Sequence, residues 1–329
     1  MASNNTTAAK IKTRFLIISD THALDHLEHL SNIPRQHADV AIHCGDLTQG
    51  SQLHEFKSSI QLLQTVDAPL KLVIAGNHDF TMDIPVFKKK VAEYPHPDTE
   101  KVFAAYGNYG QARELFSGTG ITFLDEGTHS FSLDNGAVLT VYASPYTPSL
   151  GDWGFQYHPD YGHDFTLLTS DGLRDIDVVI THGPPRGIFD YTNSRHRAGC
   201  PNLFDAVARA RPRMHCFGHI HEGWGAKLVT WRKSSGEKAS HLTDIDNEQS
   251  VSIDKLSEFK RRLGLHGESR VECSTTSHCL GDPHPLKWGL QTLFVNAAIE
   301  SAPGDLDDES LPLTQPSWLV DLELPAAAS

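Results

Sequence analysis

Five apolar stretches of the sequence each end in side chains that can bind a metal ion. These side chains are, in chain order, Asp20 with His22, Asp46, Asn77 with His78, His182, and His219 with His221. Taken singly, each has a structural explanation, because Asp and Asn cap helices and a lone His is often a satisfied core residue. Five such groups at equivalent positions along the chain favour one shared site instead.

The donor types indicate which metal such a site would hold. Carboxylates, imidazoles and one amide oxygen, with no thiolate among them, suit Mn²⁺, Fe or Zn²⁺ rather than a structural zinc site. Alternate residues of extended backbone point the same way, so the pairs Asp20/His22 and His219/His221 can each face one cavity. A carboxylate can bridge two ions about 3.5–4 Å apart, the arrangement used for in-line displacement at phosphorus. Asp46 is the candidate for that bridge, so two divalent metal ions are the expected cofactors.

Continuous apolar runs mark the elements that must position these residues. The runs lie at residues 14–20, 38–44, 70–75, 177–181 and 214–217. Continuous rather than alternating hydrophobicity predicts strands that are covered on both faces. Residues 51–66 carry apolar side chains at three- and four-residue steps, which predicts an amphipathic helix. Strand, helix and strand in this order predict an α/β sheet, whose site is built by loops at the carboxyl ends of the strands.

The rest of the chain predicts further strands and a single domain. Strand-like runs lie at residues 121–124, 138–143, 227–231, 292–297 and 318–322, and a short helix follows Pro201. We expect a disordered tail over residues 1–13, one domain over residues 14–324 and a short tail over residues 325–329.

Residues 233–285 differ in composition from the rest, being rich in Ser, Lys, Glu, Asp and His with few large apolar residues. They predict a polar insertion that contains one helix, at residues 254–265. A lid that brings His278 and His284 to the site is one interpretation, and a solvated loop is the favoured one.

The Gly-rich segment at residues 151–163 is also rich in aromatic residues, including Trp153 and Tyr157. It could line a substrate pocket, or its aromatic side chains could pack on one another. Two interpretations of Arg186 are equally open: its side chain contacts an anionic group, or it lies on the surface.

The composition bounds the class of partner. The chain has 329 residues, of which 39% are hydrophobic and 21% charged, and its formal net charge is −13. Negative charge argues against a nucleic-acid polymer or an anionic membrane as partner, because both favour basic patches. A small-molecule anionic substrate is compatible with this charge if metal ions supply local positive charge. The sequence makes no prediction of the oligomeric state.

Cysteine usage and the first residues indicate the compartment. The five cysteines are odd in number and irregularly spaced, which fits reduced thiols. Cys44 and Cys216 lie in apolar runs, as small buried residues do. Residues 1–13 lack the apolar core of a secretory signal, and no run has the length of a membrane span. We therefore expect a cytoplasmic protein.

The metal-binding groups form an ordered set of motifs: DTH at residues 20–22, GD at 45–46, GNHD at 76–79, THG at 181–183 and GHIH at 218–221. This set resembles the calcineurin-like metallophosphoesterases. The longer matches GNHDFTMD, THGPPRG, FGHIHEGWG and the late VNAA resemble the metallophosphoesterase-domain-containing subgroup. The resemblance covers most of residues 14–232 and 288–324. It implies a four-layer α-β-β-α sandwich with a dinuclear site at the sheet edge.

Carried over by position, the resemblance implies two metal sites. The first would be formed by Asp20, His22, Asp46 and His221, and the second by Asp46, Asn77, His182 and His219. Some related proteins lose the first His of GHIH together with activity, and His219 is present here. The subgroup also implies small phosphodiester substrates, including cyclic nucleotides. The sequence GDLTQ at residues 45–49 lacks the GDxxDRG continuation of protein phosphatases, which argues against phosphoprotein substrates.

The ligand set leads to a mechanistic hypothesis of phosphodiester hydrolysis. A metal-bridging hydroxide attacks phosphorus, and His78 donates a proton to the leaving alkoxide. Asp79 either orients an imidazole or caps a helix. Two alternatives stay open: a dinuclear hydrolase acting on a carboxylic ester, lactone or amide, and a binding scaffold without turnover.

Overall fold

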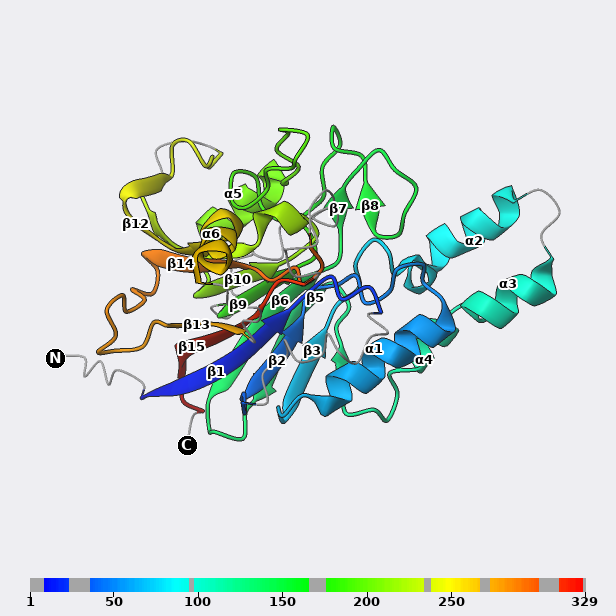
Figure 1. The fold of residues 1–329 in the computed structure, drawn as a ribbon, viewed down its shortest axis with the longest axis horizontal. Helices are drawn as coiled ribbons and strands as arrows, with labels where there is room; N and C mark the ends of the chain where they lie inside the picture. The colour runs from blue at the N-terminus through cyan, green and yellow to red at the C-terminus, as the bar shows by residue number, and fades with distance from the viewer. Residues whose placement is uncertain are drawn as a thin grey trace, which may run out of the picture.

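The computed structural model describes residues 9–23, 36–94, 98–165, 176–233, 238–266, 273–301 and 314–327. Two large β-sheets lie face to face in the centre of the molecule (Figure 1). The first sheet has six strands, in the order β13 (Cys273–Ser277), β15 (Ser317–Pro325), β1 (Lys10–Ile18), β2 (Val40–His43), β3 (Leu70–Val73) and β4 (Thr122–Phe123). The second sheet has seven, in the order β12 (Ile245–Lys255), β11 (Gly225–Trp231), β14 (Gln291–Asn296), β10 (Met214–Phe217), β9 (Val178–Thr181), β6 (Val138–Ser144) and β5 (Gly127–Ser132).

Of the helices, α1 and α5 cover the outer faces of the two sheets. The helices are α1 (Leu53–Thr65), α2 (Ile84–Glu93), α3 (Thr99–Tyr106), α4 (Gln111–Glu114), α5 (Pro201–Ala210) and α6 (Leu256–His266), with short 3₁₀ turns η2 (Phe80–Met82) and η4 (His221–Gly223). A small separate ribbon pairs β7 (Thr147–Pro148) with β8 (Gln156–Tyr157). In Figure 1, α2 and α3 extend away from the sandwich as a pair.

Alternate strand residues show how the layers form. In β1, Phe15 and Ile17 belong to the core between the sheets, whereas Leu16 and Ile18 pack outward with Phe56 of α1. Successive side chains of a strand point to opposite faces, so a strand apolar on both faces serves two cores.

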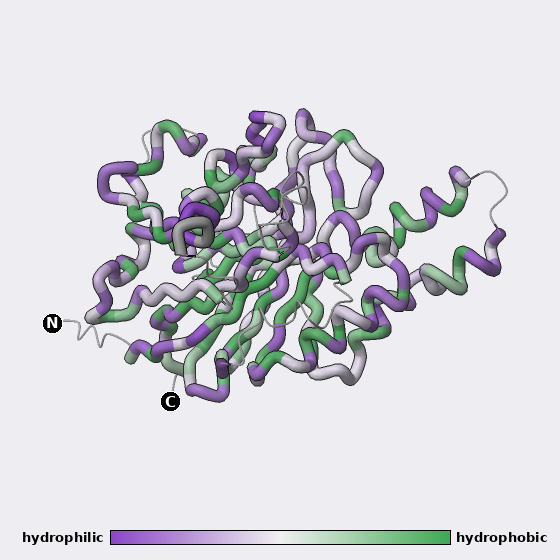
Figure 2. The backbone as a smooth tube through the Cα atoms, viewed as in Figure 1, coloured by the Kyte–Doolittle hydropathy of each residue, from purple (hydrophilic) through white to green (hydrophobic). Residues whose placement is uncertain are grey.

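The second sheet repeats the arrangement on its own outer face. In β9, Val178 and Ile180 point into the central core, and Val179 packs in another cluster with Leu203 and Phe204 of α5. The layers therefore follow the order α-β-β-α, which confirms the predicted fold class. Figure 2 shows the hydrophobic residues concentrated in the strands of the two sheets.

The carboxyl ends of the central strands gather at one edge. Strands β1, β2, β3 and β4 are parallel, and so are β6, β9, β10 and β14. An isolated parallel bridge between Ser19 and Ala298 connects the end of β1 to the segment after β14. The loops that follow strands of both sheets therefore meet at this edge.

The ends of the sandwich domain differ from the expected boundaries. Strand β1 begins at Lys10 and pairs with β15 as far as Pro325, so residues 10–13 and 325 are strand rather than tail. Residues 1–8 and 328–329 of the expected tails lie outside the described residues.

The polar insertion is more structured than a solvated loop. It contributes β12 and β13 as edge strands of the two sheets, together with α6, which confirms the predicted helix within it. The solvated-loop interpretation is therefore wrong for residues 245–266 and 273–277. Residues 234–237 and 267–272 of the insertion lie outside the described part of the chain.

The lid interpretation of His278 and His284 is wrong. The backbone N–H of His278 donates to Asp321 O at 3.0 Å, and Asp321 is the register partner of Arg14. Arg14 is the middle residue of β1, six residues before Asp20, a separation of about 20 Å along an extended chain. The His278 ring is buried there, with Nδ1 2.7 Å from His284 O.

Two further features are the state of the cysteines and the character of the helices. All five cysteines are free, and Cys44 and Cys216 are buried as expected. None of the helices in the described part of the chain combines the length and apolar character that a membrane span needs.

Candidate metal centre

Several donor residues occupy a backbone conformation that side chains rarely adopt. The φ angles are 53° at Asp20, 44° at His22, 53° at Asp46 and 67° at His219. Non-glycine residues in this left-handed region cost about 1–3 kcal/mol each, and such residues cluster at functional sites. Here the sharp turns direct the side chains back toward the edge where the sheets meet.

Two glycines allow the carboxylates to approach neighbouring loops. A Cβ atom at Gly76 would lie 2.2 Å from Asp46 Oδ1, and one at Gly218 would lie 1.9 Å from Asp20 Oδ2. The glycines of the GNHD and GHIH motifs are therefore needed for space, and any side chain there would push a carboxylate away.

The first group of donors comprises Asp20, His22 and His221, whose candidate ligand atoms all lie within 4.8 Å of one another. His221 Nε2 lies 3.4 Å from Asp20 Oδ1. The backbone N–H of His219 donates to both oxygens of Asp20, at 3.1 and 3.0 Å, which orients the carboxylate.

The second group comprises Asp46, His182 and His219, again within 4.8 Å. His182 Nε2 lies 3.2 Å from Asp46 Oδ2 and 3.0 Å from Asn77 Oδ1. The same Asp46 Oδ2 lies 3.8 Å from His22 Nε2 of the first group. Asp46 thus stands between the two groups, and all seven side chains predicted as ligands come together.

The orientation of the imidazoles fits a metal ion. His22 Nε2 is buried and makes no hydrogen bond within the described residues, although the carboxylates of Asp46 and Glu300 lie near it. Its other nitrogen, Nδ1, lies 3.2 Å from Thr48 O, and His182 Nδ1 lies 3.0 Å from Cys44 O. Metal-binding histidines generally donate their second N–H to such an acceptor. The donor set therefore fits divalent metal ions.

Buried charges of opposite sign dominate the electrostatics. Burial acts to raise the pKa of Asp20, but the hydrogen bond and charge of His221 outweigh it and hold this pKa well below its usual range. Burial likewise opposes ionisation of Asp46, and the charge of His182 lowers its pKa. Burial acts to lower the pKa of His182, whereas Asp46 raises it to about 9. Both carboxylates are therefore ionised at neutral pH and can bind a cation, whose binding would displace protons from the imidazoles.

His78 lies beside both groups of donors, and one of its ring nitrogens is engaged by a backbone carbonyl. Its Nδ1 lies 2.7 Å from Gln49 O, and its backbone N–H donates to Asp46 Oδ1 at 2.8 Å. Its ring centroid lies 4.8 Å from that of His22. If Nδ1 carries the proton shared with Gln49, Nε2 is the nitrogen left for chemistry.

Asp79 has neither of the two roles considered for it. Its carboxylate is fully buried and accepts from the backbone N–H groups of Leu47, Thr48 and Gly76 and from the Thr48 hydroxyl, at 2.7–3.1 Å. It makes no side-chain cap to η2, and in the described residues no imidazole donates to it. Asp79 therefore joins the loop after β2 to the loop after β3. Burial raises its pKa to about 7, and its four donors all require it as an acceptor.

Sequence reasoning missed Glu300. Its Oε2 lies 3.2 Å from His22 Nε2 and 3.9 Å from His221 Nδ1, so a third carboxylate borders the first group. Its backbone N–H donates to Asp20 O at 3.3 Å. The only signal available in the sequence was its position two residues after the VNAA motif.

The aromatic loop is anchored beside the site. Trp153 stacks on His78, and Gly154 N–H donates to Asn77 O at 3.0 Å. Tyr157 instead stacks on His163, with ring centroids 5.3 Å apart. Arg186 is exposed, and its backbone N–H donates to Cys200 O at 3.0 Å.

Comparison with known protein families agrees with the fold. A sandwich of this kind, with carboxylates and imidazoles at the edge where the sheets meet, defines the class of metal-dependent phosphoesterases. The chain belongs to the calcineurin-like phosphoesterase family, whose model matches residues 13–223.

Two relatives extend the comparison. Human metallophosphoesterase domain-containing protein 1 is 32% identical over 223 residues, 65% of this chain and 62% of that protein. A UPF0046 protein of Caenorhabditis elegans is 32% identical over 227 residues, 67% of this chain and 54% of that protein. The match thus spans less than two thirds of the length of either relative. Among solved structures, a purple acid phosphatase from yellow lupin seeds aligns with 90% of this chain and 46% of its own, at 12% identity and a TM-score of 0.38.

Proposed function

We propose that this protein is a metal-dependent phosphodiesterase that acts on small anionic substrates such as cyclic nucleotides. The observation that carries the proposal is the position of Asp46, whose Oδ2 lies 3.8 Å from His22 Nε2 and 3.2 Å from His182 Nε2. A carboxylate in that position is suited to bridging two ions. The first ion would bind Asp20, His22, Asp46 and His221, and the second Asp46, Asn77, His182 and His219.

The ions, which we propose to be Mn²⁺, Fe or Zn²⁺, would supply a nucleophile from water and neutralise charge on the phosphoryl oxygens. Side chains of the protein have the remaining roles. Asp46 and Asn77 hold oxygen donors in fixed places, and the buried His182 excludes water from one side of the centre. His78 donates a proton from Nε2 to the leaving oxygen, because its Nδ1 is held by Gln49 O.

The size and charge of the substrate follow from the composition. With a formal net charge of −13, the chain as a whole repels polyanions, so we propose a small molecule rather than a nucleic-acid polymer or a membrane. Positive charge at the reacting group would come from the ions.

The test measures metal content and turnover on the same preparation. We expect close to two ions per chain and hydrolysis of cyclic nucleotides and of a chromogenic phosphodiester, with slower hydrolysis of a phosphomonoester. The Asp46→Asn variant should lose both bound metal and turnover, while Asp134→Asn, an exposed change in the turn between β5 and β6, should keep both.

Two outcomes would replace the proposal. Hydrolysis of carboxylic esters, lactones or amides without any phosphoester turnover would assign the same donor set to a different electrophile. Bound metal with no turnover on any of these substrates would favour a binding scaffold.

A further inference from the structure

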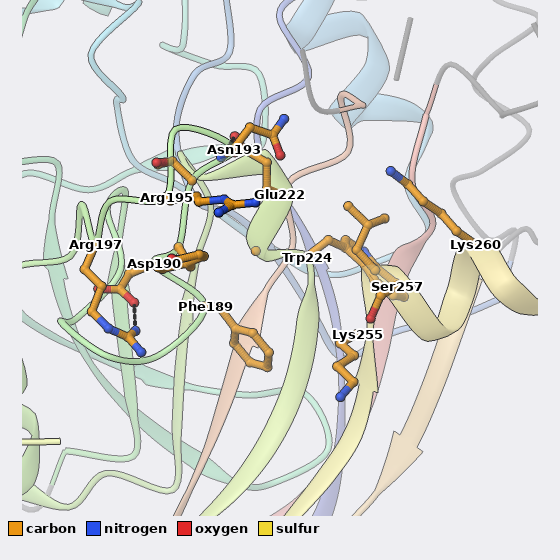
Figure 3. Close-up of a pocket in the computed structure, with 14 residues that line it drawn as sticks. Phe189, Asp190, Asn193, Arg195, Arg197, Glu222, Trp224, Lys255, Ser257 and Lys260 are labelled. Atoms are coloured by element: carbon orange, nitrogen blue, oxygen red, sulfur yellow. Dashed lines mark hydrogen bonds and ion pairs between the residues drawn. The ribbon is translucent and has the colours of Figure 1, made fainter. Parts of the chain in front are cut away.

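A cavity lies beside the metal centre, and none of the proposed metal ligands lines it. Its volume is about 680 Å³. One wall is the loop that carries Arg195 and Arg197, and the opposite wall is the end of β12 with the start of α6, which carries Lys260. Turn η4, which begins at His221, lies between the two walls (Figure 3).

The loop with Arg195 is fixed against η4. A Cβ at Gly223 would lie 2.0 Å from Phe189 O, so only glycine lets the loop pack this closely on the turn. The loop is closed by hydrogen bonds from Thr192 N to His196 O at 2.9 Å and from Arg195 N to Thr192 O at 2.8 Å. The arginine side chains of the loop are therefore presented from a preformed turn adjacent to His221.

Positive charge exceeds negative charge in the lining. The cavity is lined by four cationic side chains, Arg195, Arg197, Lys255 and Lys260, and two acidic ones, Asp190 and Glu222, and Lys255 also pairs with Glu258 at 3.2 Å. This is an unusual concentration in a chain whose formal net charge is −13. A local excess of positive charge in a concave site attracts anions.

One of the two acidic residues is already paired with a cation. Asp190 is fully buried and accepts from Gly187 N at 2.9 Å, Gly199 N at 3.3 Å and Arg197 Nη1 at 2.6 Å. The ion pair between Asp190 and Arg197 is drawn in Figure 3. It compensates the charge of Arg197 and leaves Arg195 as the arginine available to a ligand.

Glu222 accepts the backbone N–H of Asn193 at 2.8 Å, which orients its carboxylate but leaves its negative charge in the lining. Arg195 makes no side-chain hydrogen bond or ion pair within the described part of the chain. In Figure 3, Arg195 and Lys260 project from opposite sides of the cavity.

We infer that this cavity binds a small molecule through an anionic group, a phosphate or a carboxylate, held between Arg195 and Lys260. The planar guanidinium of Arg195 matches either group bidentately. The volume lies in the range of small-molecule sites, about 300–1,000 Å³. Tyr191, about half exposed, adds an aromatic surface at the rim, with the Arg197 guanidinium 5.6 Å from its ring centroid.

The anion can come from two sources, a second charged group of the substrate or a separate ligand. The binding test does not depend on phosphoester turnover, so its failure and that of the proposed function are distinguishable. Inorganic pyrophosphate is titrated calorimetrically into the full-length protein in the presence of a chelator. We expect one binding site, retained in Asp46→Asn, which disables the metal centre.

The paired substitution Arg195→Gln with Lys260→Gln should lower pyrophosphate affinity at least tenfold. The matched control is Lys57→Gln with Lys101→Gln, which removes the same charge from exposed positions on α1 and α3. It should change the affinity less than twofold. All four substitutions replace side chains away from the core, and circular dichroism checks that each variant is folded.

Three results would overturn the inference. The first is that the unaltered protein does not bind pyrophosphate. The second is that the Arg195/Lys260 variant and its charge-matched control lose pyrophosphate affinity equally. The third is that Asp46→Asn loses pyrophosphate binding while the Arg195/Lys260 variant retains it. The last result would place the anion in the metal centre.

A second experiment, which rests on the proposed function, identifies the source of the anion. If the cavity takes a distal group of the substrate, the Arg195/Lys260 variant raises KM for a diester with a second phosphate and leaves KM for a simple diester unchanged. If it takes a separate ligand, pyrophosphate changes the turnover of the simple diester without competing with it.

Discussion

The ring of Trp153 stacks on the ring of His78, with centroids 4.3 Å apart and an interplanar angle of 27°. His78 is thus held on one face by an indole and at Nδ1 by Gln49 O. The loop that carries Trp153 is in turn fixed by the bond from Phe155 N to Asp83 Oδ2 at 2.9 Å. The proposed proton donor therefore depends on a loop about 75 residues further along the chain.

Replacing Trp153 by Ala should lower kcat more than it changes KM. Loss of the stack lets the His78 ring turn, and misplacement of a catalytic group costs about 10- to 100-fold in rate. Trp153→Phe should retain most of the activity because it keeps a ring there. Trp288→Ala, at a half-exposed tryptophan beneath Arg213, is the control. A raised KM with unchanged kcat would instead make Trp153 a substrate-binding surface.

The His78→Asn variant tests proton donation directly. For a diester with a poor leaving group, we expect kcat to fall about 10²- to 10⁴-fold, the usual contribution of a general acid. For an activated leaving group such as a nitrophenolate, the loss should be much smaller, because that group needs no proton. Metal content, measured by elemental analysis, should be unchanged. An equal loss on both substrates would contradict the assignment.

Glu300→Gln should weaken metal binding at the first group. Its carboxylate lies 3.2 Å from His22 Nε2, so removing its charge removes attraction for a cation there. Groups adjoining metal ligands typically contribute 10- to 100-fold in affinity, and we expect a loss of about 10-fold. The measurement is metal retained after dialysis against a graded chelator, with Glu248→Gln, an exposed change on β12, as control. Equal retention in both variants would exclude a role for Glu300 at the metal centre.

Asp79→Asn should destabilise the protein. The amide can accept at only one atom, so at least one buried donor among Leu47 N, Thr48 N and Gly76 N loses its partner. Losing bonds to a buried carboxylate costs about 3 kcal/mol in the free energy of unfolding, which urea titration would measure. Asp134→Asn, on an exposed turn, should cost almost nothing. A matching loss in the two variants would show that the Asp79 bonds contribute little.

The free energy of unfolding should fall at acidic pH because of His215, a buried histidine outside the metal centre. Burial lowers the pKa of His215 to about 3, whereas an unfolded histidine has a pKa of about 6.5. As pH falls below about 6.5 the unfolded chain takes up a proton that the folded chain does not, so stability is lost, by about 2 kcal/mol at pH 5.

The measurement compares unfolding free energies at pH 7 and pH 5 in chelator. His215→Gln cannot take up the proton and should lose about 2 kcal/mol less between these pH values than the unaltered protein. His54→Gln, at an exposed position on α1, should follow the unaltered protein. If the three proteins lose the same stability between pH 7 and pH 5, His215 is not responsible for the loss at acidic pH.

Much of the fold is determined by local patterns in the sequence. A strand buried on both faces needs a continuous apolar run, and the runs at residues 70–75, 177–181 and 214–217 became β3, β9 and β10. Strands β12 and β13 were missed because they lie at sheet edges. Their backbones pair while many of their side chains face water, so their composition is that of a loop.

The same distinction between local patterns and long-range packing applies to the site. The sequence by itself determined which donors follow strand ends, because residue type and spacing are local properties. Only the tertiary structure decided that Glu300 borders His22, that Trp153 covers His78 and that Arg195 faces Lys260 across a cavity. Each of these pairs joins segments far apart in the chain, and their contact depends on how the sheets and loops pack, which no local periodicity encodes.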